Sequence, residues 1–108
     1  MAEIFHITVP DEWEAAQRDG SITMSTRSVT LAEEGFVHCS FGSQVAGTAA
    51  RIFGDLDAVV VLRIDAARVT SPIVVEDLYG AGEEFPHVYG PINVDAVTEA
   101  RVVSPLDV

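Results

Sequence analysis

The sequence has few basic residues for its size. Six Lys and Arg residues stand against 17 Asp and Glu residues, which gives the 108-residue chain a formal net charge of −11. A surface of this charge repels the phosphate backbone of DNA and RNA, so we expect no nucleic-acid partner. The charge still permits a local basic pocket for a small phosphorylated ligand.

The chain also has little cysteine and no long apolar run. Cys39 is the single cysteine, which excludes an intrachain disulfide and fits a reducing compartment. The first residues include Glu3 and no basic segment, so they do not resemble a signal peptide. The longest apolar run, residues 58–62, is far too short to span a bilayer. We therefore expect a cytoplasmic protein with no membrane partner.

Several familiar site motifs are missing. No glycine-rich loop joins a strand to a helix, which excludes a P-loop and a Rossmann fingerprint. The sequence has no CxxC motif and no pair of histidines four residues apart on a helix. Three histidines with Glu83 are still enough for an open zinc site, so a metal-dependent hydrolase stays as a third hypothesis. We expect no bound metal, and the cofactor is otherwise open.

Composition and residue alternation predict one small α+β domain, residues 1–108. Hydrophobic residues make up 48% of the chain, which is typical of a folded globule. Alternation predicts strands over 3–9, 21–25, 36–40, 58–64, 73–78 and 97–103. The main helices are predicted over 10–18 and 43–53, with a shorter helix ending before Gly35. This order favours a mixed or antiparallel sheet, with the most apolar strand, 58–64, at its centre and covered on both faces.

The stretch 76–91, EDLYGAGEEFPHVYGP, is predicted to be a shaped loop. Its three glycines allow backbone conformations closed to other residues, while Pro86 and Pro91 fix the backbone. Loops on a rigid scaffold often carry binding groups. We expect this loop to present two carboxylates, an imidazole and a phenol to a ligand: Glu83, Glu84, His87 and Tyr89. The alternative is a glycine-rich hairpin whose carboxylates are only solvated.

Each of the three histidines has a hydroxyl side chain two residues later. The pairs are His6 with Thr8, His38 with Ser40, and His87 with Tyr89. On a strand, residues two apart point to the same face, so each pair is suited to hold one ligand. A neutral imidazole both donates and accepts hydrogen bonds, which suits a ribose diol or a phosphate oxygen. The alternative is that each histidine is structural and bonded to backbone.

Glu83 is the candidate for a catalytic carboxylate, although the sequence leaves open whether Glu83 or Glu84 faces the cleft. A carboxylate beside an aromatic ring, here Phe85 or Tyr89, is suited to hydrogen-bond a sugar hydroxyl or to stabilise a developing positive charge. Cys39 is expected to be a small buried hydrophobe, because it lies on the opposite face of its strand from the neighbouring histidine.

Motifs spread over nearly the whole chain carry a resemblance to a known family. They are FHIT at 5–8, Trp13 in the first helix, EEGFVHCS at 33–40, Gln44, LRID at 62–65 and EDLYGAGEEFPHVYGPIN at 76–93. In these motifs the chain resembles the bacterial domain-of-unknown-function family 952. Val75 departs from that family, which tends to have tryptophan before Glu76, so no aromatic wall is expected there.

The resemblance implies a fold and a site but no established activity. The family looks like a distant relative of the ADP-ribosyltransferase fold, a split sheet that binds NAD. On this comparison the segment HIT at 6–8 resembles the first-strand motif that holds the NAD ribose. Glu83 is then similar to the late glutamate that acts on the ribose, and Tyr89 or Phe85 to the aromatic residue that stacks on nicotinamide.

We therefore expect one cleft that gathers residues far apart in the chain. Catalytic roles fall to Glu83, His38 and His87, and ligand-binding roles to His6, Thr8, Ser40, Phe85 and Tyr89. The leading hypothesis is an ADP-ribosyltransferase-type enzyme that acts on NAD or a related nucleotide. The alternative is a non-catalytic module that binds a nucleotide, sugar phosphate or carboxylate. The sequence names no substrate, acceptor or oligomeric state.

Overall fold

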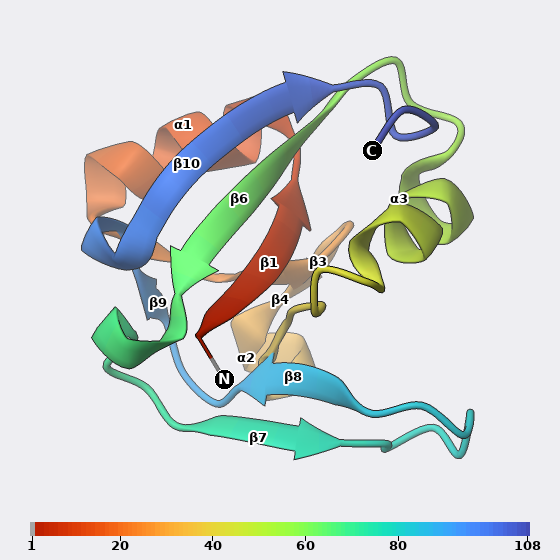
Figure 1. Ribbon diagram of the computed structural model, residues 1–108. Helices are drawn as coiled ribbons and strands as arrows, with labels where there is room; N and C mark the ends of the chain where they lie inside the picture. The colour runs from red at the N-terminus through yellow and green to blue at the C-terminus, as the bar shows by residue number, and fades with distance from the viewer. Residues whose placement is uncertain (1) are drawn as a thin grey trace.

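The computed structural model describes residues 2–108. Its longest strands form an antiparallel sheet in which β6 (Val59–Asp65) lies between β1 (Glu3–Thr8) and β10 (Val97–Val103) (Figure 1). Residues 59–62 of β6 are buried, because strands flank both of its edges and side chains pack on both of its faces. The predicted central position of this strand is confirmed.

A second three-stranded sheet meets the first at β1. Its order is β5-β8-β7, with β5 at Val37–His38, β8 at Phe85–Val88 and β7 at Ile73–Glu76, and both of its strand pairs are antiparallel. The two sheets join where Phe5 and Ser40 exchange backbone hydrogen bonds of 2.8 and 2.7 Å. This junction fixes the segment after β5 against β1, and thereby positions residues 38–40 for the site.

Two shorter strand pairs complete the β structure. They join β2 (Ser21–Ile22) to β9 (Ile92–Asn93), and β3 (Met24–Thr26) to β4 (Val29–Thr30). Single turns of 3₁₀ helix, η1 (Ala66–Arg68) and η2 (Val94–Ala96), follow β6 and precede β10. Every strand pair within residues 2–108 is antiparallel, so the antiparallel form of the predicted sheet is the one observed.

Two of the three α-helices have recognisable capping chemistry, at the end of α1 and at the start of α2. Helix α1 (Pro10–Asp19) has Pro10 at its first position and ends at Gly20, which has a left-handed φ of 86°. Helix α2 (Leu31–Glu34) starts with a capping box between Thr30 and Glu33. Helix α3 spans Val45–Phe53. No helix within residues 2–108 combines the length and the apolar character needed to cross a membrane.

Side chains alternate between two hydrophobic clusters on opposite faces of the β1-β6-β10 sheet. Ile4 of β1 belongs to the cluster that includes Ala16 of α1, whereas Ile7 belongs to the cluster that includes Phe53 of α3. Figure 1 shows α1 and α3 on the two sides of this sheet. This alternation along β1 decides which of its residues reach the site.

The stretch 76–91 differs from the prediction of a single shaped loop. Its second half contains β8, and residues 77–84 connect β7 to β8 as an antiparallel hairpin. Pro86 indicated a loop because proline cannot donate to a sheet ladder. In the structure its carbonyl oxygen still accepts a hydrogen bond of 3.1 Å from the Cys39 N–H, so the strand loses only one donor. The sequence also gave no separate signal for β4 and β9.

Candidate functional site

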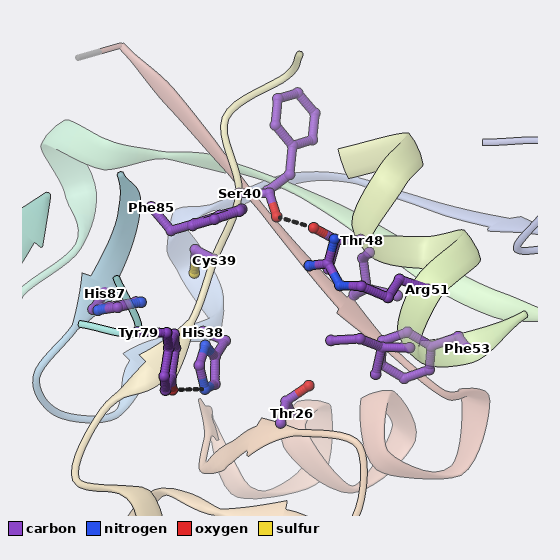
Figure 2. A pocket seen from close by; sticks show the side chains of 13 residues that line it. Thr26, His38, Cys39, Ser40, Thr48, Arg51, Phe53, Tyr79, Phe85 and His87 are labelled. Carbon is purple, nitrogen blue, oxygen red and sulfur yellow. Dashed lines mark hydrogen bonds between the residues drawn. The ribbon is translucent and has the colours of Figure 1, made fainter. Parts of the chain in front are cut away.

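A pocket lies between β1, α3, the segment after β5 and the β7–β8 hairpin (Figure 2). Its enclosed volume is about 130 Å³. The walls are mainly aromatic and aliphatic, with imidazoles, hydroxyl groups and one guanidinium among them. The lining residues are Phe5, Ile7, Thr26, His38, Cys39, Ser40, Thr48, Arg51, Ile52, Phe53, Tyr79, Phe85 and His87.

The lining contains no Asp or Glu, although the chain has 17 of these residues. Arg51 lies on the exposed side of α3 and has no ion-pair partner within residues 2–108. The Ser40 hydroxyl donates to the Thr48 hydroxyl at 3.3 Å, beside Arg51 in Figure 2. The pocket thus has a guanidinium at its rim and no carboxylate in its lining, inside a strongly negative molecule.

The imidazole of His87 is held by a carboxylate from the neighbouring strand. Its Nδ1–H donates to Glu76 Oε2 at 2.9 Å, and the Tyr89 hydroxyl donates to the same oxygen. The bonds from Tyr89 and His87 lower the pKa of Glu76, so its carboxylate stays ionised at neutral pH. Phe36 stacks on the His87 ring with centroids 4.1 Å apart. The ring is 1% exposed, and its orientation is therefore fixed on several sides.

The imidazole of His38 has a similar set of neighbours from other elements. The Tyr79 hydroxyl donates to Glu34 Oε1 at 2.8 Å, and His38 Nε2 lies 3.3 Å from both that oxygen and the Tyr79 hydroxyl. Burial is the main cause that lowers the pKa of His38, and the nearby His87 lowers it further. Burial and the bond to Glu34 raise the pKa of Tyr79 to about 12, so its hydroxyl keeps its proton.

Local sequence explains why Glu34 and Tyr79 reach His38. The capping box at Thr30 starts α2, which places Glu34 at its end, and Gly35 with φ 94° then turns the chain into β5. In the hairpin loop, the Asp77 carboxylate accepts hydrogen bonds from two backbone N–H groups, at residues 81 and 82. These bonds shape the loop that carries Tyr79 over the pocket.

The structure brings four of the expected site residues into the pocket wall: His38, His87, Ser40 and Phe85. His6 is not among them, because it alternates with the lining residues Phe5 and Ile7 on β1 and points to the opposite face. It is 2% exposed, and its Nδ1–H donates to the His38 carbonyl oxygen at 2.7 Å. Burial lowers the pKa of His6 to about 4, so this histidine is neutral.

Three further expected residues also lie outside this pocket. Thr8 shares the face of His6 and lines a second cavity next to Trp13, where its hydroxyl donates to Glu12 at 3.4 Å. Glu83 is exposed in the hairpin loop, and Tyr89 bonds to Glu76 behind His87. The neighbouring Glu84 is also exposed. The prediction placed all these residues in one cleft, together with a glutamate of the hairpin loop. The structure brings only part of this set together.

Sequence reasoning missed the residues that orient and complete the pocket. They are Glu34, Glu76, Phe36, Tyr79 and Arg51. One signal was present for Arg51, because Thr48, Arg51 and Ile52 share one helical face by their spacing of three and four residues. The partners Glu34 and Glu76 had no such signal, since each meets its histidine only through tertiary packing.

Two other candidate chemistries have little geometric basis here. Cys39 is 4% exposed, and burial raises the pKa of its thiol far above the ordinary value, so no thiolate forms at neutral pH. No group of three or more His, Cys, Asp or Glu side chains within residues 2–108 is arranged to hold a metal ion.

Comparison with known proteins places the chain in a family. Residues 7–100 match the family described as "Protein of unknown function (DUF952)". The chain therefore belongs to the DUF952 family, and the resemblance seen in its sequence is confirmed at this level.

Solved structures of one bacterial protein are similar over almost the whole chain. The crystal structure of protein CC0527 from Caulobacter crescentus is 35% identical, with a TM-score of 0.77 over 93% of this chain and 84% of that one. The solution NMR structure of CC0527 gives a TM-score of 0.72 over 94% and 84% of the two chains. No curated protein matches the chain. None of these matches supports the relationship to ADP-ribosyltransferases, so only the small, mostly antiparallel α+β fold is established.

Proposed function

We propose that this protein binds a small anionic ligand, of the nucleotide or sugar-phosphate type, in the pocket between β1, α3 and the β7–β8 hairpin. Arg51 contacts the anionic group at the rim. The hydroxyls of Ser40 and Thr48 accept and donate hydrogen bonds beside it, and the rings of Phe85 and Tyr79 pack against the sugar or base.

The observation that carries the proposal is the distribution of charge. The chain has a net charge of −11, yet the pocket lining has no carboxylate. Three arginines are paired with a carboxylate: Arg18, Arg27 and Arg63. Arg51 has no such partner within residues 2–108, and it is the arginine that lines the pocket. An unpaired guanidinium beside hydroxyl groups is suited to a phosphate or carboxylate.

The size of the pocket favours a small ligand. Its 130 Å³ is below the roughly 300–1,000 Å³ typical of pockets for drug-sized molecules. One ring or one phosphorylated sugar fills such a volume, and the rest of a larger molecule has to lie across the exposed rim formed by Arg51 and Tyr79. A mononucleotide therefore fits the proposal better than a whole dinucleotide.

An ADP-ribosyltransferase-type activity in the same pocket is a second version of this proposal, and it has less support. It needs a first-strand histidine at the ribose and a late glutamate at the reacting carbon. His6 faces away from the pocket and Glu83 is exposed outside it, so neither group has the expected geometry. NAD accordingly enters the experiment as one of the ligands tested.

Isothermal titration calorimetry with AMP, ribose 5-phosphate, NAD and inorganic phosphate tests the proposal. We expect AMP or ribose 5-phosphate to bind at millimolar concentration or below. Arg51→Gln should weaken that binding about tenfold, because hydrogen bonds to charged groups contribute roughly 1.5–3 kcal/mol and exposure reduces this.

Arg101→Gln is the matched control, since Arg101 is an exposed arginine of β10 outside the pocket and has no ion-pair partner within the described chain. It should leave the affinity unchanged. Absence of heat with all four ligands at millimolar concentration, or equal losses for both arginine variants, contradicts the proposal. The transferase version predicts a different result. The protein would then bind NAD selectively, and Glu83→Gln would keep that binding but abolish turnover.

A further inference from the structure

We propose that His87 is the general base of this pocket, and that the pocket hydrolyses a phosphate ester as well as binding it. The inference rests on the proposed function, because it needs an anionic ligand held at Arg51. It adds a reaction class and assigns the proton transfer to one named atom, Nε2 of His87.

Glu76 determines which nitrogen of His87 carries the proton. A carboxylate only accepts hydrogen bonds, so the 2.9 Å contact with Glu76 Oε2 keeps the hydrogen on Nδ1 and leaves the lone pair on Nε2. The Tyr89 hydroxyl donates to the same oxygen and holds the carboxylate in place. An imidazole that a carboxylate orients through one nitrogen, and that offers the other to a ligand, is the arrangement used for general-base catalysis.

The surroundings of His87 favour this role over a purely structural one. Phe36 stacks on one face of the ring with centroids 4.1 Å apart, and the bond to Glu76 holds Nδ1, so two contacts orient the ring. The ring lines the same pocket as Arg51 and Ser40, and Figure 2 shows it at one end, toward the pair formed by His38 and Tyr79.

The proposed step is the hydrolysis of a phosphate diester. Nε2 of His87 takes one proton from a water molecule while the water oxygen forms a bond to phosphorus. The P–O bond to the leaving group breaks, and the leaving oxygen departs with the electron pair and takes a proton from solvent at the open rim. The proton on Nε2 then returns to solvent, and Glu76 stabilises the transient imidazolium without itself becoming protonated. Arg51 stabilises the charge on the non-bridging oxygens.

The experiment measures hydrolysis of bis(4-nitrophenyl) phosphate and of 2′,3′-cyclic AMP between about pH 5 and 9. We expect turnover that His87→Gln lowers by roughly 10²- to 10⁴-fold, the usual contribution of a general base. Glu76→Gln should lower kcat at least about tenfold with KM unchanged, because the amide can donate to Nδ1 and so favours the wrong tautomer. Arg51→Gln should instead raise KM, and Arg101→Gln, outside the pocket, should match the wild type.

A second measurement uses the wild-type protein, so its result does not depend on whether a variant folds. Nitrogen-15 chemical shifts of the neutral His87 ring should show the hydrogen on Nδ1, which faces Glu76, and the Nε2 signal should shift when AMP is added. Wild-type protein that binds AMP but turns over neither ester overturns this inference and leaves the proposed function intact. Turnover that survives His87→Gln, or a His87 protonated on Nε2 instead, also overturns it. If the protein binds neither AMP nor any other anion of the calorimetric panel, both proposals are wrong.

Discussion

His38 and His87 lie directly opposite each other in the β5–β8 pair, with ring centroids 5.3 Å apart and ring planes at 83°. Each imidazole contacts a different carboxylate, Glu34 for His38 and Glu76 for His87. Glu34 comes from α2 and Glu76 from β7, so neither carboxylate belongs to the strand pair that carries the imidazoles. The orientation of the two histidines therefore requires that all four elements are folded together.

We expect Glu76→Gln to remove part of the acid sensitivity of the fold. Hydrogen bonds from Tyr89 and His87 lower the pKa of Glu76, so the folded protein binds this proton less readily than the unfolded chain. Their stabilisation is fully present above the ordinary glutamate pKa of 4.5 and is lost as the pH falls through the lower folded value. Urea unfolding should show a variant that is less stable than the wild type near neutral pH, with a difference that shrinks as the pH falls below 4.5. An offset that stays constant with pH would refute this account.

His6 should make the protein lose stability as the pH falls from 6.5 to about 4. Burial lowers the pKa of His6 from 6.5 to about 4, so over this range the unfolded chain binds a proton that the folded protein does not. The loss is on the order of 3 kcal/mol at most, since one pKa unit corresponds to about 1.4 kcal/mol, and this contribution levels off below pH 4. The ring protons of His6 should not shift in NMR spectra between about pH 5 and 8, whereas a midpoint near 6.5 would contradict the prediction.

Gly90→Ala should destabilise the protein, whereas Gly47→Ala should not. Gly90 has φ 151°, and an added Cβ would lie 2.5 Å from the Ser71 hydroxyl, which donates to the Pro91 carbonyl. We expect a loss of about 1–3 kcal/mol from strain and overpacking. Gly47 lies within α3, where a Cβ meets nothing within 4 Å, so alanine should add about 0.5–1 kcal/mol. Chemical denaturation measures both changes, and equal effects would argue against the geometry around Gly90.

Thr30→Ala should remove the capping box of α2. The Thr30 hydroxyl accepts from the Glu33 N–H at 3.2 Å, and the Glu33 carboxylate accepts from the Thr30 N–H at 3.0 Å. Loss of such a cap costs about 1 kcal/mol. Because α2 carries Glu34, the variant should also change the NMR environment of the His38 ring. Thr23→Ala is the control, since the Thr23 side chain is exposed and has no hydrogen bond within residues 2–108. An undisturbed His38 in the Thr30 variant would show that Glu34 does not depend on the cap.

Most of the fold was predictable because local chemistry and side-chain periodicity agree with the tertiary structure. The apolar run at 58–64 predicted a central strand, and Pro10 and Gly20 predicted the ends of α1, because these signals do not depend on distant residues. Strand β8 was missed because Pro86 and the flanking glycines outweighed its apolar residues. Its place is decided by pairing with β5 and β7, which no local pattern shows.

The site was predictable only where strand periodicity determines direction. His38 and Ser40 were expected on one face, and both line the pocket. Cys39 was expected on the opposite face, and that prediction is wrong in so far as Cys39 also lines the pocket. The same rule places His6 on the opposite face of β1 from Phe5. Whether His6 joins the other two histidines therefore depends on which face of β1 meets α3, and the sequence does not show this. The carboxylates that contact the imidazoles come from α2 and β7, and their identity depends on how these elements pack.

The absence of carboxylates from the lining has a consequence for rates of exchange. An anion that approaches the molecule is largely screened from the negative surface until it comes within roughly 8 Å, the screening distance at physiological ionic strength. Arg51 attracts it only after that. Added electrolyte weakens the repulsion and so speeds entry, and it also weakens the contact with the guanidinium and so speeds departure. The occupancy of the pocket then changes little with salt concentration, whereas the bound anion exchanges faster with anions in solution.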